Sequence, residues 1–222
     1  MLTLNGATVR TEDGQIEPRG PSALPEDLPE EVRHLRGMLT LLDGTVVGVR
    51  PMLAEDSDLL CAFHARLSPD AITFRYFHLV PVLVPALVEH LTHLSYTDRT
   101  ALVATSGEGG EEQIIAVVRY EGLDAGRAEV AFLVEDRWQH HGIATALLHR
   151  LAAYARAHEY TTFIAEVLAS NAAMREVLRN AGFPYTTVYD QGTVEMRLDI
   201  RGAPHFAAAP APGAQGPDHT HP

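Results

Sequence analysis

The chain has 222 residues, of which 46% are hydrophobic, and it carries a formal net charge of −12 at pH 7. The length predicts one domain with tails, and the hydrophobic fraction is large enough for a core. The negative charge argues against a nucleic-acid-binding protein, because duplex nucleic acid would be repelled. It fits ordinary solubility, and it also fits a surface that attracts a cationic substrate.

Cysteine content and hydropathy indicate a soluble, cytoplasmic protein without a membrane partner. The single cysteine, Cys61, permits no disulfide within the chain, which suits a reducing compartment. The N-terminus lacks the basic start and apolar run of a secretory signal. The most apolar window, LVPVLVPALV from Leu79, contains two prolines. It is far shorter than the roughly 20 apolar residues of a membrane helix.

The two ends of the chain are predicted to lie outside the folded unit. Residues 1–44 are rich in Gly, Pro and acids, so we expect a flexible segment with a helical turn or two near Glu30–Met38. This segment is too short for a preceding cyclic-nucleotide domain. Residues 201–222 form a Pro/Ala/His tail that predicts disorder, and its His219 and His221 are no more than a chance metal site. The folded domain is therefore expected over residues 45–200.

The elements up to about residue 92 are predicted as one strand followed by two or three helices. Thr45–Arg50 alternates in hydrophobicity and predicts a strand, whereas Asp56–Leu67 has helical spacing. Ser68 is a typical N-cap for a short helix that has Pro69 at its first position. A further short helix is expected after Pro85.

Three β-rich runs come next, and the short glycine-rich turns between them predict antiparallel neighbours. A helix, a strand, another helix and two strands are expected to follow. This order predicts an α+β protein with a mixed sheet, not an alternating doubly wound one. The expected ranges are Thr100–Thr105, Gln113–Tyr120, Arg127–Val134, His141–His158, Thr161–Val167, Asn171–Asn180, Tyr185–Tyr189 and Thr193–Ile200.

The turn in RWQHHGIATALLHRL, which starts at Arg137, suits a phosphate or pyrophosphate. The first N–H groups of a helix have no partner within it, and together with the helix dipole they attract anions. Gly142 and Ala144 would let a phosphate approach the backbone closely. A plain strand-to-helix turn with small residues for packing explains the same residues.

Two nucleotide-binding motifs are excluded at this turn. A P-loop needs Gly-x-x-x-x-Gly-Lys-Ser/Thr, and the chain has no such run. A Rossmann site needs Gly-x-Gly-x-x-Gly, of which the first and third glycines are missing here. Glu166 lies where a ribose-binding acid would lie, but the antiparallel strands upstream argue against that fold.

The turn and its surroundings resemble the GNAT superfamily of N-acetyltransferases, whose acyl-CoA motif is Gln/Arg-x-x-Gly-x-Gly/Ala between a strand and a helix. Here the motif reads QHHGIA, from Gln139 to Ala144. The family's later strand, its Asn-initiated helix and the closing Gly-Phe resemble FIAEVLASNAAMREVLRNAGF, from Phe163 to Phe183. The resemblance covers about residues 45–200. It implies the acyl-CoA N-acyltransferase fold, with a central, mostly antiparallel sheet flanked by helices.

A narrower resemblance points to the Pat-type bacterial protein lysine acetyltransferases. These often carry Leu-Ser-x-x-Ser-x-x-x-Arg-Phe-Phe, which is similar to the stretch from Leu67 to Phe77 here. The run AEVAF and the Asn171-x-x-Met174 start of the late helix are similar as well.

The resemblance implies transfer of an acetyl group from the co-substrate acetyl-CoA to a primary amine, either a protein lysine or a small amine. Such an amine has a pKa near about 10.4, so it must lose a proton before it attacks. Glu129 is the candidate general base, because Pat-like relatives keep a catalytic Glu at this place; a solvated strand-end charge is the alternative. Glu135 is the reserve candidate.

The resemblance also implies which residues hold the cofactor. The backbone of the strand would pair with the pantetheine arm, and the N–H groups of the turn would hold the pyrophosphate. Thr145 would add a hydroxyl, and Asn171 would either contact the cofactor or cap its helix. The strand residues are Phe132, Leu133 and Val134, and the turn residues are Gln139, His140, His141, Gly142, Ile143 and Ala144.

Several assignments stay open on sequence alone. Many GNAT enzymes use a Tyr as general acid where this chain has Leu178, so that role is unassigned. Arg75 is expected either on the acceptor side or in an ion pair, and the aromatic residues Phe74, Tyr76 and Phe77 are expected in the core. The twelve histidines show no metal-binding spacing. A regulatory acyl-CoA-binding module without turnover and a pure interaction domain are the rivals from other classes.

Overall fold

The structure is a computed structural model, and it describes residues 24–107, 112–124 and 126–202. The predictions for residues 1–23 and for the tail from residue 203, including His219 and His221, lie outside the described residues. Within the described residues the predicted order of elements is confirmed. A short helix and one strand that was not predicted precede the first predicted strand.

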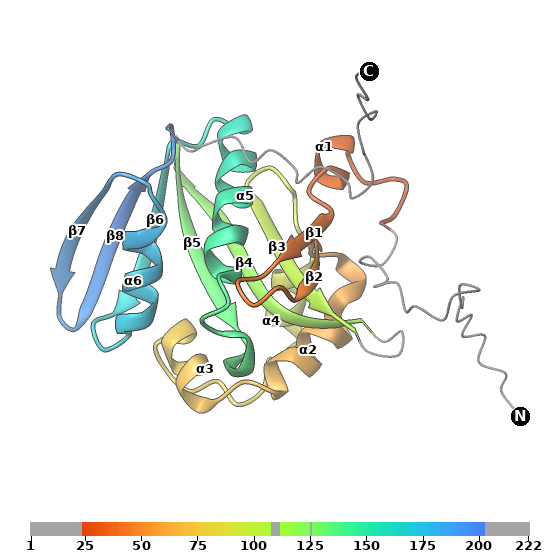
Figure 1. The fold of residues 1–222 in the computed structure, drawn as a ribbon, viewed down its shortest axis with the longest axis horizontal. Coiled ribbons are helices and arrows are strands. Elements are labelled where there is room, and N and C mark those ends of the chain that lie inside the picture. Colours follow the sequence, from red (N-terminus) through yellow and green to blue (C-terminus); the bar gives the residue numbers. More distant parts are fainter. Residues whose placement is uncertain (1–23, 108–111, 125, 203–222) are drawn as a thin grey trace, which may run out of the picture.

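A sheet of eight strands forms the centre of the molecule, in the order β1-β2-β3-β4-β5-β6-β8-β7 (Figure 1). Neighbouring strands are antiparallel except β5 and β6, which are parallel. The predicted mixed, mostly antiparallel sheet is therefore confirmed. The strands are β1 (Gly37–Thr40), β2 (Val46–Pro51), β3 (Arg99–Ser106), β4 (Gln113–Asp124), β5 (Arg127–Val134), β6 (Thr162–Leu168), β7 (Tyr185–Asp190) and β8 (Thr193–Asp199).

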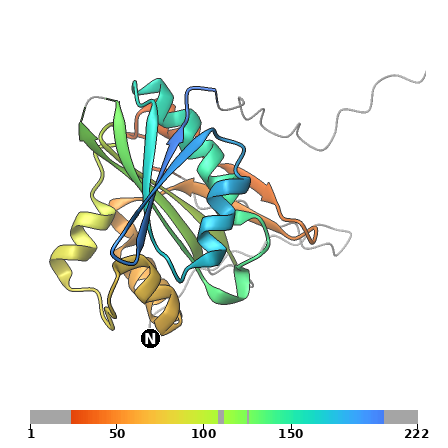
Figure 2. The same ribbon diagram turned by 90° about the vertical axis from the view of Figure 1, so that its left-hand side faces the viewer.

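Helices cover both faces of the sheet, because side chains alternate between its faces along each strand. One face packs on α5 (Ile143–Ala157), which carries Leu147, Leu148 and Leu151 into the larger core cluster. The other face packs on α2 (Ser57–Ala65), α3 (Pro69–Tyr76) and α4 (Pro85–Thr92), which form the second cluster. Figure 2 shows α5 and α6 (Ala172–Asn180) on one side of the sheet and the helices of the second cluster on the other.

The folded unit begins earlier than the expected boundary at residue 45. Helix α1 (Glu30–Arg33) lies where a helical turn was expected, but β1 was not predicted. Strand β1 pairs antiparallel with β2, and Val32 and Leu41 are buried in the larger core cluster. Strand β1 has only four residues, and only alternate ones are partly covered, so it is too short to show the alternation that marks a strand.

Helix α5 begins at Ile143, two residues after the predicted start. His140 and Gly142 have φ angles of 65° and 83°, and a left-handed backbone cannot continue into a right-handed helix. Gly142 therefore becomes the residue that precedes the helix. The predicted start of α3 is confirmed, since the Ser68 hydroxyl accepts a hydrogen bond from the Ala71 N–H and Pro69 occupies the first turn.

Strands β5 and β6 are paired only at their beginnings. Their register joins Arg127 to Thr162, Ala128 to Phe163 and Glu129 to Ile164, and no pairing beyond Glu129 occurs among the described residues. Strand β5 stays paired with β4 as far as Val134, and β6 stays paired with β8 as far as Leu168. The sheet therefore opens between β5 and β6 from Glu129 onward, and Figure 1 shows the two strands diverging.

Candidate functional site

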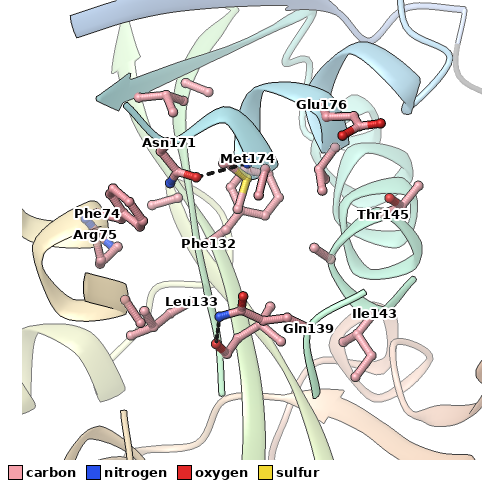
Figure 3. Close-up of a pocket in the computed structure, with 18 of the residues that line it drawn as sticks. Phe74, Arg75, Phe132, Leu133, Gln139, Ile143, Thr145, Asn171, Met174 and Glu176 are labelled. Carbon is pink, nitrogen blue, oxygen red and sulfur yellow. Dashed lines mark hydrogen bonds between the residues drawn. The ribbon is translucent and has the colours of Figure 1, made fainter. Parts of the chain in front are cut away.

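A pocket of about 810 Å³ occupies the opening between β5 and β6. Its walls come from both faces of the sheet, with α3 on one side and α5 and α6 on the other (Figure 3). Its floor includes Ala131, Phe132 and Leu133 of β5 and Ala165 and Val167 of β6. Because both strands lack a strand partner here, their backbone N–H and C=O groups are available to an extended ligand.

The turn after β5 closes one end of this pocket. Gly142 directly precedes α5, whose first internal hydrogen bond runs from the Ala146 N–H to the Gly142 carbonyl. The N–H groups of Ile143, Ala144 and Thr145 therefore lie in the first turn, where a helix offers its donors to an anion. The side-chain amide of Gln139 donates to the Val134 carbonyl at 3.2 Å and ties the turn to the end of β5 (Figure 3).

Gly142 is required at its position by its backbone conformation, not by lack of space. A Cβ atom there would meet Leu42 Cγ at 3.5 Å, which is an ordinary contact. Its φ of 83° is a conformation that side chains other than glycine adopt at a cost of about 1–2 kcal/mol. The left-handed residues His140 and Gly142 bend the backbone twice within three residues, an arrangement that gathers N–H groups.

His141 does not line the pocket, although it belongs to the predicted turn residues. Its Nδ1 lies 3.2 Å from Asp43 Oδ2, and its carbonyl accepts a hydrogen bond from the Leu42 N–H. Its ring also packs edge-on against Trp138, with 6.3 Å between the centroids. These contacts attach the turn to the connection between β1 and β2, so His141 holds the turn from behind.

Glu129 lies at the point where β5 and β6 separate, and its side chain lines the pocket. It is exposed and forms no ion pair or hydrogen bond within the described residues. The five steps from Glu129 to Val134 span about 17 Å of extended strand. An anion held at the turn and a group that reacts at Glu129 must therefore be joined by a long, thin arm.

Glu135, the reserve candidate, has a structural role. It is buried. One carboxylate oxygen accepts a hydrogen bond from Arg66 Nε at 3.1 Å, and the other forms an ion pair with Arg137 Nε at 2.7 Å. It does not line the pocket. A carboxylate held by two guanidinium groups has no free oxygen to receive a proton from a substrate amine.

Asn171 caps α6 and also lines the pocket. Its Oδ1 accepts a hydrogen bond from the Met174 N–H at 3.0 Å (Figure 3). Its amide nitrogen has no hydrogen-bond partner within the described residues, although the side chain is buried. The geometry of Asn171 is therefore compatible with both predicted roles, a helix cap and a contact with the cofactor.

Helix α3 contributes more to the pocket than the sequence indicated. Phe74 and the exposed Phe77 line it, so these two are wall residues and not the core residues that were expected; Tyr76 packs against the second core cluster. Arg75 also lines the pocket and makes no ion pair within the described part of the chain; its guanidinium lies 5.1 Å from the Tyr76 ring centroid.

The position of α3 is fixed by contacts with the segment that follows β5. Asp136 accepts hydrogen bonds from the Ser68 N–H at 3.0 Å and from the Ser68 hydroxyl at 2.6 Å. Ser68 in turn caps α3. The start of α3 and the residues before the turn that leads into α5 are thus held together.

Acidic side chains dominate the charge of the pocket lining. Its carboxylates are Asp70, Glu129, Asp136, Glu166 and Glu176, whereas Arg75 is the only lysine or arginine among its lining residues. A cationic group of a ligand is therefore favoured by this lining. No tyrosine or cysteine is among the lining residues, and Leu178 is fully buried.

The described residues form neither a metal-binding cluster nor a membrane-spanning helix. No group of three or more His, Cys, Asp or Glu in this part of the chain has the arrangement of a metal site. None of the helices within residues 24–107, 112–124 and 126–202 is long and apolar enough to cross a membrane.

Comparison with protein families identifies a match for the central part of the chain. The model of the acetyltransferase (GNAT) family matches residues 72–183. An acetyltransferase of Pseudomonas aeruginosa is 31% identical over 145 residues, which are 65% of this chain and 78% of that protein. The acetyltransferase Pat of Mycolicibacterium smegmatis is 32% identical over 154 residues, which are 68% of this chain but only 45% of that protein.

Comparison with solved structures gives the same result for the fold. The GNAT domain of Streptomyces lividans PAT superimposes with a TM-score of 0.70 at 35% identity, over 78% of this chain and 99% of that domain. A cAMP-binding acyltransferase from Mycobacterium smegmatis superimposes with a TM-score of 0.55 at 28% identity. The match covers 81% of this chain and 53% of that protein, so the chain spans about half of the larger relative.

Proposed function

Because the chain belongs to the GNAT family of acetyltransferases, we propose that it moves an acetyl group from acetyl-CoA to a primary amine, with Glu129 as general base. One observation carries this proposal. A single pocket joins an anion-binding turn, two unpaired strand edges and an unpaired carboxylate in that order. Pyrophosphate, pantetheine arm and reacting thioester follow one another along CoA in the same order.

The proposed cofactor contacts use the backbone more than side chains. The N–H groups of Gln139–Ala144 and the hydroxyl of Thr145 bind the pyrophosphate. The open edge of Phe132–Val134 pairs with the amide groups of pantetheine as an added strand would. Asn171 offers its free amide nitrogen from the start of α6. His141 supports the turn and contributes its backbone alone.

In the proposed reaction, the ammonium of the acceptor first gives a proton to the Glu129 carboxylate, directly or through a water molecule. The nitrogen lone pair then attacks the thioester carbonyl carbon. A C–N bond forms, the C–S bond breaks, and CoA departs as a thiolate. The second proton of the attacking nitrogen passes to the departing thiolate or to water, which leaves a neutral amide. A thiol with a pKa near about 8.5 is an adequate leaving group, so the reaction proceeds without the tyrosine that is replaced by Leu178.

We propose a protein lysine side chain as the acceptor. The resemblance to Pat-type enzymes supports this choice, and so does the acidic lining of the pocket, which favours a cation. A small amine is the alternative substrate of the same site. Acetylated lysine detected by mass spectrometry in an added protein, compared with turnover of a panel of free amines, distinguishes the two. We place the protein in the cytoplasm.

A non-catalytic acyl-CoA-binding module is a second candidate function, because no tyrosine lines the pocket. Such a module binds acetyl-CoA but releases no CoA thiol with any amine. Release of free thiol, followed with a thiol-reactive dye over an amine panel, therefore separates the enzyme from the module.

The experiment that tests the cofactor site is a calorimetric titration of the full chain with acetyl-CoA. We expect the wild type to bind and Gly142→Trp to lose binding, since an indole at the turn occupies the place of the pyrophosphate. Gly182→Trp is the matched control, because Gly182 also has a positive φ of 78° and nothing lies within 4 Å of its Cβ position. Absence of binding by the wild type would contradict the proposal.

A further inference from the structure

A second, smaller cavity adjoins the main pocket beneath α3. It has a volume of about 30 Å³ and shares Arg75, Ala131, Phe132 and Leu133 with the main pocket. The rest of its wall is apolar or aromatic apart from Arg119. A cavity of this size has room for about one small polar group.

Arg119 is a buried cation without a matched partner. Its side chain is 6% exposed overall, and its Nη2 makes no hydrogen bond with any described residue. Its nearest carboxylate oxygen, Oε2 of Glu121, is 3.9 Å away, which is too far for a hydrogen bond. Burial, together with the positive charge of Arg75, lowers the pKa of Arg119 to about 10.

The other deeply buried arginine shows how this chain satisfies a structural guanidinium. Arg50 is 1% exposed, and it donates to Asp56 at 2.6 Å and 2.8 Å and to Glu112 at 3.0 Å. A buried charge that lacks such bonds lowers the stability of the fold. Arg119 therefore has the features of a group whose partner is a ligand.

The register places Arg119 at the reacting end of the main pocket. Arg119 of β4 lies directly opposite Ala131 of β5, and Glu121 lies opposite Glu129. Arg119 and Glu129 are therefore diagonal neighbours, about 7–8 Å apart, on the sheet face covered by α2, α3 and α4. The small side chain of Ala131 leaves the space between them open.

We propose that Arg119 and Arg75 form a carboxylate-binding subsite beside the reacting end of the pocket. This inference rests on the proposed function and specifies its substrate class. The position opposite Ala131, between the proposed pantetheine edge and Glu129, favours a carboxylate at the far end of the acyl group, as in succinyl-CoA. A carboxylate on the amine acceptor has the same chemistry and is the other source.

The transfer step remains balanced with such a donor. Glu129 holds the first proton of the acceptor ammonium. The amine nitrogen bonds to the thioester carbonyl carbon, the C–S bond breaks, and CoA leaves as a thiolate that takes the second nitrogen proton. The second carboxylate of the acyl group takes no part in bond making. It forms charge-assisted hydrogen bonds with Arg119 Nη2 and with Arg75, which lies at the mouth of the small cavity.

The test compares acyl donors of equal chain length. Calorimetry with the full chain measures the affinities for acetyl-CoA, butyryl-CoA and succinyl-CoA, and thiol release measures turnover. We expect succinyl-CoA to bind at least about tenfold more tightly than butyryl-CoA. We expect Arg119→Met to abolish this preference, and Arg75→Met to weaken it. Arg127→Met, at the far end of β5, is the matched control.

Thermal unfolding separates a ligand-binding role from a structural one. If Arg119 binds a ligand, we expect Arg119→Met to unfold at the same temperature as the wild type or at a higher one, because the substitution removes an unpaired buried charge. If Arg119 instead has a structural role, its loss would lower the midpoint temperature of unfolding. If Arg119→Met does not fold, Arg75→Met still tests the preference, because Arg75 is only partly buried.

A second arm identifies the source of the carboxylate. With acetyl-CoA as donor, kcat/KM is compared for 4-aminobutyrate and butylamine. A preference for the amino acid that depends on Arg119 assigns the carboxylate to the acceptor. The inference is overturned if the carboxylate-bearing compound is not preferred in either comparison. It is also overturned if such a preference persists in both Arg119→Met and Arg75→Met. In either case a water molecule is the occupant of the small cavity. Failure of all acyl-CoA donors to bind would instead contradict the proposed function.

Discussion

The carboxylates near the two ends of β5 show how surroundings decide the role of a residue. Glu129 and Glu135 are six residues apart on one continuous stretch of chain. Glu135 is buried and held by two arginines, whereas Glu129 lines the pocket where β5 and β6 separate. The sequence alone kept both as candidate bases, and the geometry leaves Glu129 as the one with free oxygens.

At Glu129, we expect Glu129→Gln to lower kcat by about 10²–10⁴, because the amide cannot take the proton of the incoming ammonium. The affinity for acetyl-CoA should change little, since the proposed cofactor contacts lie farther along β5. Steady-state kinetics with thiol detection and calorimetry measure the two effects. Glu89→Gln, on the exposed surface of α4, serves as the control. If Glu166→Gln lost kcat to this extent while Glu129→Gln remained active, the general base would be Glu166 on β6 instead.

At the scale of a single element, α6 depends on the residue before it. The helix has nine residues and buries only Leu178 fully, so packing alone stabilises it weakly. The cap from Asn171 to the Met174 N–H satisfies one of the donors at its start. The same helix supplies Met174, Glu176 and Val177 to the pocket wall.

Substitutions of Asn171 separate its capping role from its proposed contact with the cofactor. Asn171→Ala should lower the free energy of unfolding by about 1 kcal/mol, and Asn171→Ser should restore most of it, because serine also caps helices. The affinity for acetyl-CoA should fall by about threefold to tenfold in both variants, since both lack the amide nitrogen. Chemical denaturation and calorimetry measure these effects. Full affinity in Asn171→Ser would show that Asn171 acts only as a cap.

At the scale of the whole molecule, two histidines make the stability depend on pH. His64 is 3% exposed, and burial lowers its pKa below 6.5. Burial also lowers the pKa of His149, against a smaller opposing effect of its hydrogen bond with the Ala181 backbone. Below pH 6.5 the unfolded chain therefore binds protons that the folded chain resists.

We accordingly expect the free energy of unfolding to fall as the pH falls below 6.5, by up to about 1.4 kcal/mol per pH unit for each histidine protonated only in the unfolded state. His64→Met should reduce this slope, whereas Leu60→Met, in the same helix, should leave it unchanged. Urea denaturation between pH 5 and 8 provides the measurement. Equal slopes in wild type and His64→Met would contradict the role of His64.

Lining residues of the candidate pocket that are contiguous in the chain could be predicted from the sequence, whereas those assembled from distant segments could not. The turn from Gln139 to Thr145 is read from one stretch, because its glycine, its small residues and the following helix are neighbours in the chain. The positions of Phe74 and Arg119 at the two cavities could not be predicted. Phe74 on α3 and Arg119 on β4 each lie more than ten residues from β5 in the chain, and only the fold brings them beside it. Strand β1 escaped prediction because it has only four residues and follows a segment rich in Gly, Pro and acids, and its strand structure depends on pairing with β2.

The separation of β5 from β6 makes the sheet an unfinished structure. Two backbone edges that would be joined in an ordinary sheet are left to water between residue 130 and the turn. Under the proposed function the co-substrate supplies the missing hydrogen bonds, and it thereby acts as a temporary part of the fold. The protein should then become more resistant to unfolding as acetyl-CoA accumulates and less so as it is depleted, so its stability reports the acetyl-CoA supply around it.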